Sequence, residues 1–189
     1  MGRNHTVAAA AAALLLTVAA CSADTPAAEP EVSAPLAAHG LGGMTGKEIV
    51  DHLDRLGGED RPADLMASVR AEELLVTDGT EEITVELPED SFYLSVAPFV
   101  EATHECYYHS LTTCQGELAE QDVDVTFTTT DGEVLIDETT TTFANGFVGY
   151  WLPRDVEGTF EVSHDGLTGE VAVTTGEEDP TCLTTLQLT

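Results

Sequence analysis

Two patterns of apolar residues divide the chain. From about residue 45 to residue 70, apolar residues recur every three or four positions, which is typical of helices buried on one face. Beyond residue 70 they alternate with polar residues in short runs, which is typical of strands with one buried face. This order predicts an α+β protein in which a short N-terminal helical and strand region precedes an antiparallel β-sandwich.

The expected helices lie near the start of this region. Thr45 and Glu48 stand at the spacing of a capping box, so the first helix is expected to begin at Thr45. Gly57-Gly58 ends it, and its apolar stripe consists of Ile49, Leu53 and Leu56. A second short helix is expected to open at Pro62, with three residues facing inward, Leu65, Met66 and Val69.

Short strands and turn dipeptides follow. Four turn dipeptides, at spacings short enough for successive hairpins, are Asp78-Gly79, Asp131-Gly132, Asn145-Gly146 and Asp165-Gly166. The alternating positions are Leu74/Val76, Ile83/Val85/Leu87, Phe92/Leu94/Val96, Val123/Val125/Phe127, Val134/Ile136, Phe147/Trp151, Phe160/Val162 and Leu167/Val171/Val173. A last strand is expected over residues 181–188, with one face formed by Cys182, Thr184, Leu186 and Leu188. These patterns predict an α+β region over residues 44–100 and a β-sandwich region over residues 101–189.

Residues 1–20 have the pattern of an export signal. Arg3 precedes an Ala/Leu/Val-rich run over residues 7–20, which is too short to cross a bilayer, since a spanning helix needs about 20 apolar residues. The run ends in Val18-Ala19-Ala20-Cys21, which resembles a bacterial lipobox. We therefore expect lipidation of Cys21 and an anchor on the outer face of the membrane. The alternative is ordinary cleavage, with Cys21 as an incidental thiol.

The segment over residues 21–43 is rich in alanine and proline and has no apolar period. Such a composition predicts a semi-extended tether between the lipid and the folded region. The charge is strongly acidic, with 6 Lys+Arg against 35 Asp+Glu and a formal net charge of −29. A surface of this sign repels nucleic acid and anionic lipid, so we expect no nucleic-acid partner and membrane contact through the anchor only.

The cysteine count raises a question about redox state. An exported chain meets oxidising conditions in which disulfides persist. Of the 4 cysteines, removing Cys21 leaves Cys106, Cys114 and Cys182. An odd number means either one disulfide and a free thiol, or three reduced thiols that share a task.

Two of these thiols and two imidazoles lie within a short stretch, as His104, Cys106, His109 and Cys114. Their spacing is not that of a Cys-x-x-Cys redox motif or a zinc ribbon. His104-Glu105 begins like a metalloprotease motif, but Tyr108 stands where the second histidine is needed. No motif of hydrolytic catalysis occurs in the sequence, so we do not predict an enzyme.

Metal binding is one interpretation of this stretch. Thiolates select Cu(I) or Zn(II) over hard cations. Three thiolates suit trigonal Cu(I), whereas a zinc site would need a fourth ligand from His104 or His109. The other interpretation is a disulfide between Cys106 and Cys114, which would stabilise a surface domain for protein interaction by roughly 2–3 kcal/mol. Spacing alone leaves both interpretations open.

Longer segments resemble the CueP family of periplasmic copper-binding proteins. The similar segments are residues 92–99 (FYLSVAPF), 103–118 (THECYYHSLTTCQGEL), 145–155 (NGFVGYWLPRD) and 181–188 (TCLTTLQL). The likeness covers most of residues 46–189, in order.

The resemblance implies that Cys106, Cys114 and Cys182 match the three copper-associated cysteines of the family. It also implies a role in copper resistance, in which periplasmic copper is held and passed to client enzymes. The thiols of the family are linked to reduction of Cu(II) to Cu(I). The lipobox, the tether and the extreme acidity are departures from the family pattern. They leave the cysteines unchanged but bear on the partners and the route of delivery.

Overall fold

The computed structural model describes residues 1–2 and 33–189, and residues 33–189 belong to one compact unit. The expected signal segment, Cys21 and most of the expected tether therefore lie outside the described residues. Within the described part, no helix has the length and apolar character needed to span a membrane.

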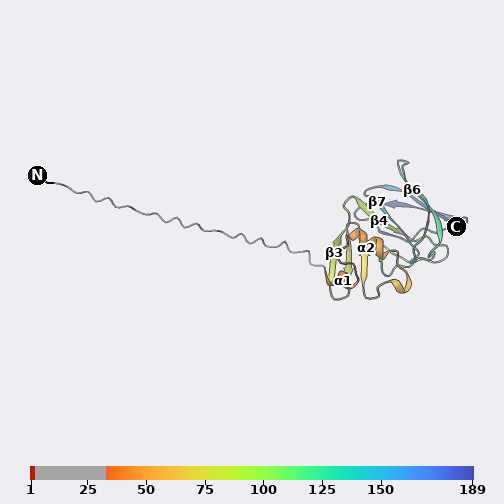
Figure 1. Ribbon diagram of the computed structural model, residues 1–189. Helices are drawn as coiled ribbons and strands as arrows, with labels where there is room; N and C mark the ends of the chain where they lie inside the picture. Colours follow the sequence, from red (N-terminus) through yellow and green to blue (C-terminus); the bar gives the residue numbers. More distant parts are fainter. Residues whose placement is uncertain (3–32) are drawn as a thin grey trace. The chain divides into compact units, whose positions relative to one another are not determined.

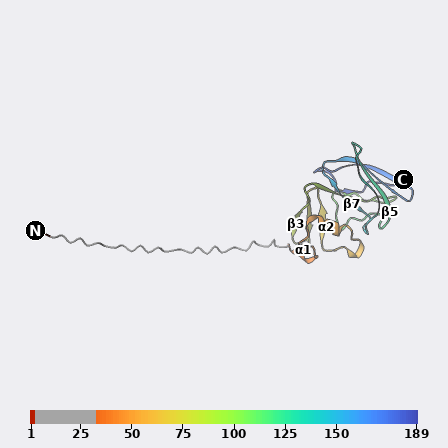
Figure 2. The same ribbon diagram turned by 45° about the horizontal axis from the view of Figure 1, so that its top comes forward.

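Short helices precede ten strands in the described part (Figures 1 and 2). The helices are α1 (Ala34–Ala38), α2 (Gly46–Leu53) and the 3-10 helix η1 (Gly58–Asp60). The strands are β1 (Met66–Val69), β2 (Glu73–Thr77), β3 (Glu82–Glu86), β4 (Ser91–Val96), β5 (Asp122–Thr129), β6 (Val134–Thr141), β7 (Val148–Pro153), β8 (Glu157–His164), β9 (Leu167–Thr174) and β10 (Cys182–Leu183). They form three sheets with the orders β1-β2-β3, β10-β4-β7 and β6-β5-β8-β9. The predicted α+β class with a β-sandwich is confirmed.

The middle sheet, β10-β4-β7, is buried on both faces. On one face, Phe92, Leu94 and Val96 of β4 pack in a core with residues of the third sheet, including Val125 and Phe160. On the other face, Tyr93 packs in a second core with apolar residues of α2 and β2, which are Ile49, Val50, Leu53, Leu74 and Val76. Since side chains alternate along a strand, Ser95 points to the same face as Tyr93. Figures 1 and 2 both show α1, α2 and β3 together on one side of the folded part.

The start of the folded part differs from the prediction. The tether was expected to reach residue 43, but α1 forms at Ala34–Ala38 and buries Leu36. Leu41 is also buried, with 1% of its surface exposed, in the core of α2 and β2. The two leucines form no regular pattern in the sequence, but they add buried apolar area to this core. The folded region therefore begins ahead of residue 44.

The second predicted helix, from Pro62, is wrong. Residues 66–69 form β1 instead, which pairs antiparallel with β2. The residues buried here are Leu65, Ala67 and Val69, which is a period of two, whereas Met66 is 60% exposed. A short apolar run fits either the helical period or the strand period of two, and here pairing with β2 selects the strand.

The predicted boundary at residue 100 does not coincide with a boundary between sheets. β4, from the region over residues 44–100, pairs antiparallel with β7 and parallel with β10, so it is the central strand of the middle sheet. The expected last strand is limited to Cys182–Leu183, followed by a single bridge between Phe99 and Gln187. The predicted inward face is nevertheless buried, at Cys182, Thr184, Leu186 and Leu188.

Candidate metal centre

The loop between β4 and β5 holds four of the five candidate ligands: the predicted Cys106 and Cys114, and the two alternative histidines, His104 and His109. Backbone hydrogen bonds fix this loop on two sides. Val69 N of β1 donates to His109 O at 2.8 Å, and Cys182 N of β10 donates to Tyr107 O at 3.1 Å. The loop is thus held between β1 and β10, which brings the fifth candidate ligand, Cys182, to the other four.

Thr181 reinforces this junction. Its side chain is fully buried, its Oγ1 donates to Val69 O at 2.7 Å, and the same oxygen accepts from His109 N at 3.0 Å. One hydroxyl therefore satisfies backbone groups of β1 and of the loop, and it fixes the residue that precedes Cys182.

No disulfide joins Cys106, Cys114 and Cys182, and Cys114 lies at the centre of the group. Cys106 Sγ lies 3.4 Å from Cys114 Sγ, which also accepts a hydrogen bond from Ser110 N at 3.4 Å. The ligand atoms of His104, Cys106 and Cys114 lie within 4.8 Å of one another, and so do those of His109, Cys114 and Cys182. All five candidate ligands therefore meet around one sulfur atom.

The two histidines differ in their surroundings. His109 is fully buried, and its Nδ1 lies 3.5 Å from Cys182 Sγ. His104 is half-buried, and its Nε2, although shielded from solvent, has no hydrogen-bond partner among the described residues. Because one ring nitrogen of His104 also lies within 4.8 Å of the Cys106 and Cys114 sulfur atoms, the ring could join them in binding a metal ion.

A carboxylate that sequence reasoning missed lies behind His109. Asp54 is fully buried, directly after α2, and its Oδ1 lies 2.6 Å from His109 Nε2. Burial opposes ionisation of Asp54, but the charge of His109 and hydrogen bonds from His109, Tyr93 and Ser95 lower its pKa below the usual range. The sequence did contain a signal, because Asp54 follows Val50 by four residues on the buried face of the helix.

Ionisation of the other groups follows from this arrangement. Burial lowers the pKa of His109, but the charge and hydrogen bond of Asp54 outweigh burial and raise it to about 9. Hydrogen bonds from Cys106 and Cys182 hold the pKa of Cys114 well below its usual range. The hydrogen bond with Cys114 raises the pKa of Cys106 to about 12, and hydrogen bonds with Cys106 and Cys114 raise that of Cys182 well above its usual range. The metal-free cluster thus concentrates its negative charge on Cys114.

Apolar side chains cover the inner side of the cluster. Cys114 and Cys182 pack with Ala97 and Phe147, and Cys106 packs against this group from a partly buried position. The fully buried Phe147 ring lies 4.6 Å from the His109 ring, centroid to centroid. A water-poor environment of this kind strengthens electrostatic interactions with a bound cation.

The outer side of the cluster is open. A hollow of about 440 Å³ is lined by Phe99, Thr103, His104, Glu105, Cys106, Thr184 and Thr185. It gives the cluster a route to solvent beside Cys106.

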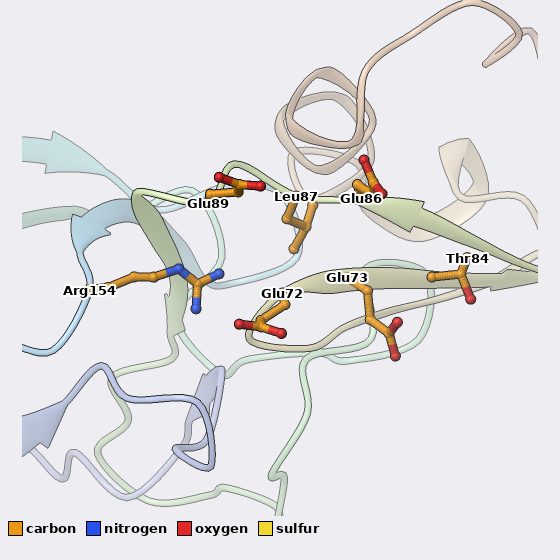
Figure 3. A pocket seen from close by; sticks show the side chains of 7 residues that line it. All are labelled: Glu72, Glu73, Thr84, Glu86, Leu87, Glu89 and Arg154. Atoms are coloured by element: carbon orange, nitrogen blue, oxygen red, sulfur yellow. The ribbon is translucent and has the colours of Figure 1, made fainter.

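A second hollow, of about 510 Å³, has different chemistry (Figure 3). It is lined by Glu72, Glu73, Thr84, Glu86, Leu87, Glu89 and Arg154. Its polar side chains are carboxylates, one hydroxyl and one guanidinium, with no thiol or imidazole among the described residues that line it. Arg154 extends into this hollow and also donates to Ala71 O. Among the described residues, the groups of side chains close enough together to hold a metal ion all belong to the cysteine cluster.

The cluster fits a soft metal ion. Thiolates bound about 2.3 Å from one ion lie about 3.8–4.0 Å apart in trigonal or tetrahedral geometry. The atoms of each three-residue group already lie within 4.8 Å of one another, and Cys106 and Cys114 are separated by 3.4 Å. Small side-chain rotations would therefore suffice to bring thiolates around an ion.

The fold and this cluster define a β-sandwich protein with a cysteine–histidine cluster that could bind a metal ion. The comparisons with known proteins are more specific. The family model "Periplasmic copper-binding protein CueP" matches residues 48–187, so the chain belongs to the CueP family, and the resemblance noted in the sequence is confirmed.

A solved structure supports the same assignment. The "Crystal Structure of S.CueP" is similar to this chain with a TM-score of 0.77 and 43% sequence identity, over 82% of this chain and 94% of that chain. No curated protein matches the chain significantly. Membership of a periplasmic family agrees with the expected export of the chain.

Proposed function

We propose that this protein holds Cu(I) outside the cytoplasm through the thiolates of Cys106, Cys114 and Cys182, for copper resistance and for delivery to extracytoplasmic enzymes. The main support is the meeting of the three cysteines around Cys114, where His104 and His109 each belong to one group of ligand atoms. Three soft ligands in a largely apolar pocket favour Cu(I) over harder cations. Family membership favours copper over other soft metals.

The disulfide interpretation is less favoured. A staple between Cys106 and Cys114 would leave Cys182 as an isolated thiol, yet Cys182 lies in the same cluster. It would also leave the unpartnered nitrogen of His104 without a role.

Alanine at Cys182 tests the copper site. The Cys182→Ala variant is expected to bind Cu(I) far more weakly than the unchanged protein, measured by competition with a chromophoric Cu(I) chelator. Unchanged affinity would remove Cys182 from the site. Thiol counting on freshly exported protein adds a second test: three free thiols that Cu(I) protects support the site, and one free thiol supports the staple.

Zinc is the second candidate metal, because either histidine could complete a four-coordinate site with the three cysteines. Competition between Cu(I) and Zn(II) for the same protein decides between them. Protection of the thiols by Zn(II) that added Cu(I) does not displace would favour zinc.

The same thiols could also reduce copper. Two thiolates would transfer one electron each to two Cu(II) ions, giving two Cu(I) ions and one disulfide. Cys106 and Cys114 are suited to this reaction because their sulfur atoms are already 3.4 Å apart. Formation of one disulfide for each two Cu(II) ions consumed is the expected stoichiometry, measured by thiol titration.

Anchoring is a further part of the proposal. Lipidation at Cys21, which lies outside the described residues, would keep the copper site at the outer face of the membrane. Cys21→Ser is expected to move the protein from the membrane fraction to the soluble fraction without changing its affinity for Cu(I).

A further inference from the structure

Asp54 is surrounded by hydrogen-bond donors. His109 Nε2 lies 2.6 Å from Oδ1, and Asn145 Nδ2 donates to the same oxygen at 2.8 Å. Tyr93 Oη and Ser95 Oγ donate to Oδ2 at 2.5 Å and 3.1 Å. The two oxygens thus accept four side-chain hydrogen bonds inside the protein. A buried carboxylate with this many partners has a defined position and orientation.

The surrounding backbone is adapted to this arrangement. Gly149 of β7 lies opposite Ser95 in the middle sheet, and a Cβ atom at this position would overlap the Tyr93 hydroxyl. The absence of a side chain lets the hydroxyl reach Asp54. Gly146 has a φ of +82°, and its close contact with Gly116 holds the turn of Asn145 against the loop of the cysteines.

The ring of His109 connects Asp54 to the thiols. Its Nε2 faces the carboxylate, and its other nitrogen, Nδ1, lies 3.5 Å from Cys182 Sγ. Because an ionised carboxylate can only accept, Nε2 must carry the hydrogen of this pair. When the ring is neutral, Nδ1 therefore presents its lone pair to the cysteine cluster.

We propose that Asp54 is a positioning residue for the copper site: it holds His109 through Nε2, so that Nδ1 is directed at an ion bound by Cys114 and Cys182. Carboxylates commonly act on histidine ligands in this way, by fixing the orientation and the tautomer of the ring. The inference rests on the proposed function. It adds Asp54, which directly follows α2, to a site whose other residues come from the loop and β10.

The central test replaces Asp54 by asparagine, which keeps the shape and removes the charge. Asp54→Asn is expected to weaken Cu(I) binding by about 10- to 100-fold. Asp51→Asn is the matched control. Asp51 lies in α2, three residues before Asp54, and it accepts hydrogen bonds from Trp151 and Lys47 outside the cluster. Its affinity for Cu(I) should stay within about twofold.

A double-mutant cycle separates positioning from a general effect on folding. If Asp54 acts through His109, Asp54→Asn should cost little affinity once His109→Gln is present. Full additivity of the two losses would overturn the proposal, since it would mean that Asp54 stabilises the site without acting on the ring.

Nitrogen NMR of the His109 ring supplies a direct readout, with Ag(I) as a soft d10 substitute that, unlike Cu(I), is not oxidised in air to a paramagnetic ion. In the unchanged protein, Nε2 should carry the proton and Nδ1 should show the shift of a metal-bound nitrogen. Asp54→Asn should shift or broaden both signals, whereas identical ring signals in the two proteins would overturn the proposal.

Tyr93→Phe keeps the inference testable if Asp54→Asn fails to fold. It removes one hydrogen bond to Oδ2 and leaves the contact between His109 and Oδ1 intact. We expect a fall in Cu(I) affinity of about threefold, together with a change in the Nε2 signal. An unchanged Nε2 signal in this variant would count against the network.

The outcomes also distinguish this inference from the proposed function. If Cys182→Ala does not weaken Cu(I) binding, the three-thiolate site itself is wrong. If Cys182→Ala weakens binding but Asp54→Asn changes neither affinity nor the ring signals, only the role of Asp54 is wrong.

Discussion

The cluster has two halves that share Cys114. The inner half, defined as His109 and Cys182, is fully or almost fully buried, and Asp54 holds its imidazole from behind. The outer half, defined as His104 and Cys106, is half-buried beside an open hollow. In the inner half each side chain has defined polar partners, whereas in the outer half a ring nitrogen has none among the described residues. The comparison suggests that the inner half provides rigidity and the outer half provides access.

Cys114→Ser tests whether both halves of the cluster depend on Cys114, and it should have the largest effect on Cu(I) affinity. Because both halves include this sulfur, we expect a loss of Cu(I) affinity greater than the roughly 100-fold that partners outside the ligand set typically cost. Chelator competition measures the loss, and Cys21→Ser is the matched control. A loss smaller than tenfold would mean that the halves bind independently.

Thiol alkylation of the reduced, metal-free protein should separate the halves by accessibility. Cys182 is 2% exposed, so it reacts only after local opening, whereas Cys106 faces the hollow. The pKa of both thiols is raised, so thiolate formation does not favour Cys182. We expect Cys182 to react at least about 100-fold more slowly, corresponding to an opening free energy of roughly 3 kcal/mol.

Mass spectrometry of the alkylated peptides gives the two rates. Urea at unfolding concentration is the control and should make them similar. Equal rates in the folded protein would remove the distinction between the halves.

His104→Gln tests the outer half alone. We expect Cu(I) affinity to fall by about tenfold, which corresponds to 1.4 kcal/mol, because the three thiolates and the inner imidazole remain. The rate of copper transfer to an external chelator should rise by a similar factor. An effect as large as that of His109→Gln would show that the two imidazoles are equivalent.

Phe147→Leu should have the smallest effect of the four. The ring is fully buried beside the His109 ring, and its loss leaves a small cavity. We expect the free energy of unfolding to fall by about 1 kcal/mol, measured by urea denaturation of the metal-free protein. Val134→Ala, at an exposed position, is the control and should change it by less than about 0.5 kcal/mol. No loss in Phe147→Leu would mean that the wall of the inner half is loosely packed.

The sequence predicted the members of the cluster better than their surroundings. The cysteines and histidines are chemically distinctive, and the resemblance to a known family selected among them. Asp54 was missed because a single acid in a helical pattern looks like a solvated residue until its partners are known. Those partners, Tyr93, Ser95 and Asn145, come from distant parts of the chain.

The fold shows the same division between local and distant information. The hairpin between β2 and β3 follows from a turn dipeptide flanked by alternating residues, and it is confirmed. The turn at Asn145-Gly146 predicted another hairpin, but β6 pairs with β5 and β7 pairs with β4, so this turn connects two sheets. The parallel pairing of β10 with β4 has no local signal, because it depends on where the chain returns after the third sheet.

The wide sequence separation within the cluster has a consequence for the order of folding. His109 is 55 residues from Asp54 and 73 residues from Cys182, so the centre can form only after large loops have closed. An unfolded chain possesses the thiols but not the centre. An ion bound there would link β10 to the loop after β4 and act as a reversible cross-link that selects the completed fold. Copper at 1,000 times its dissociation constant would add about 4.1 kcal/mol to the stability of that fold.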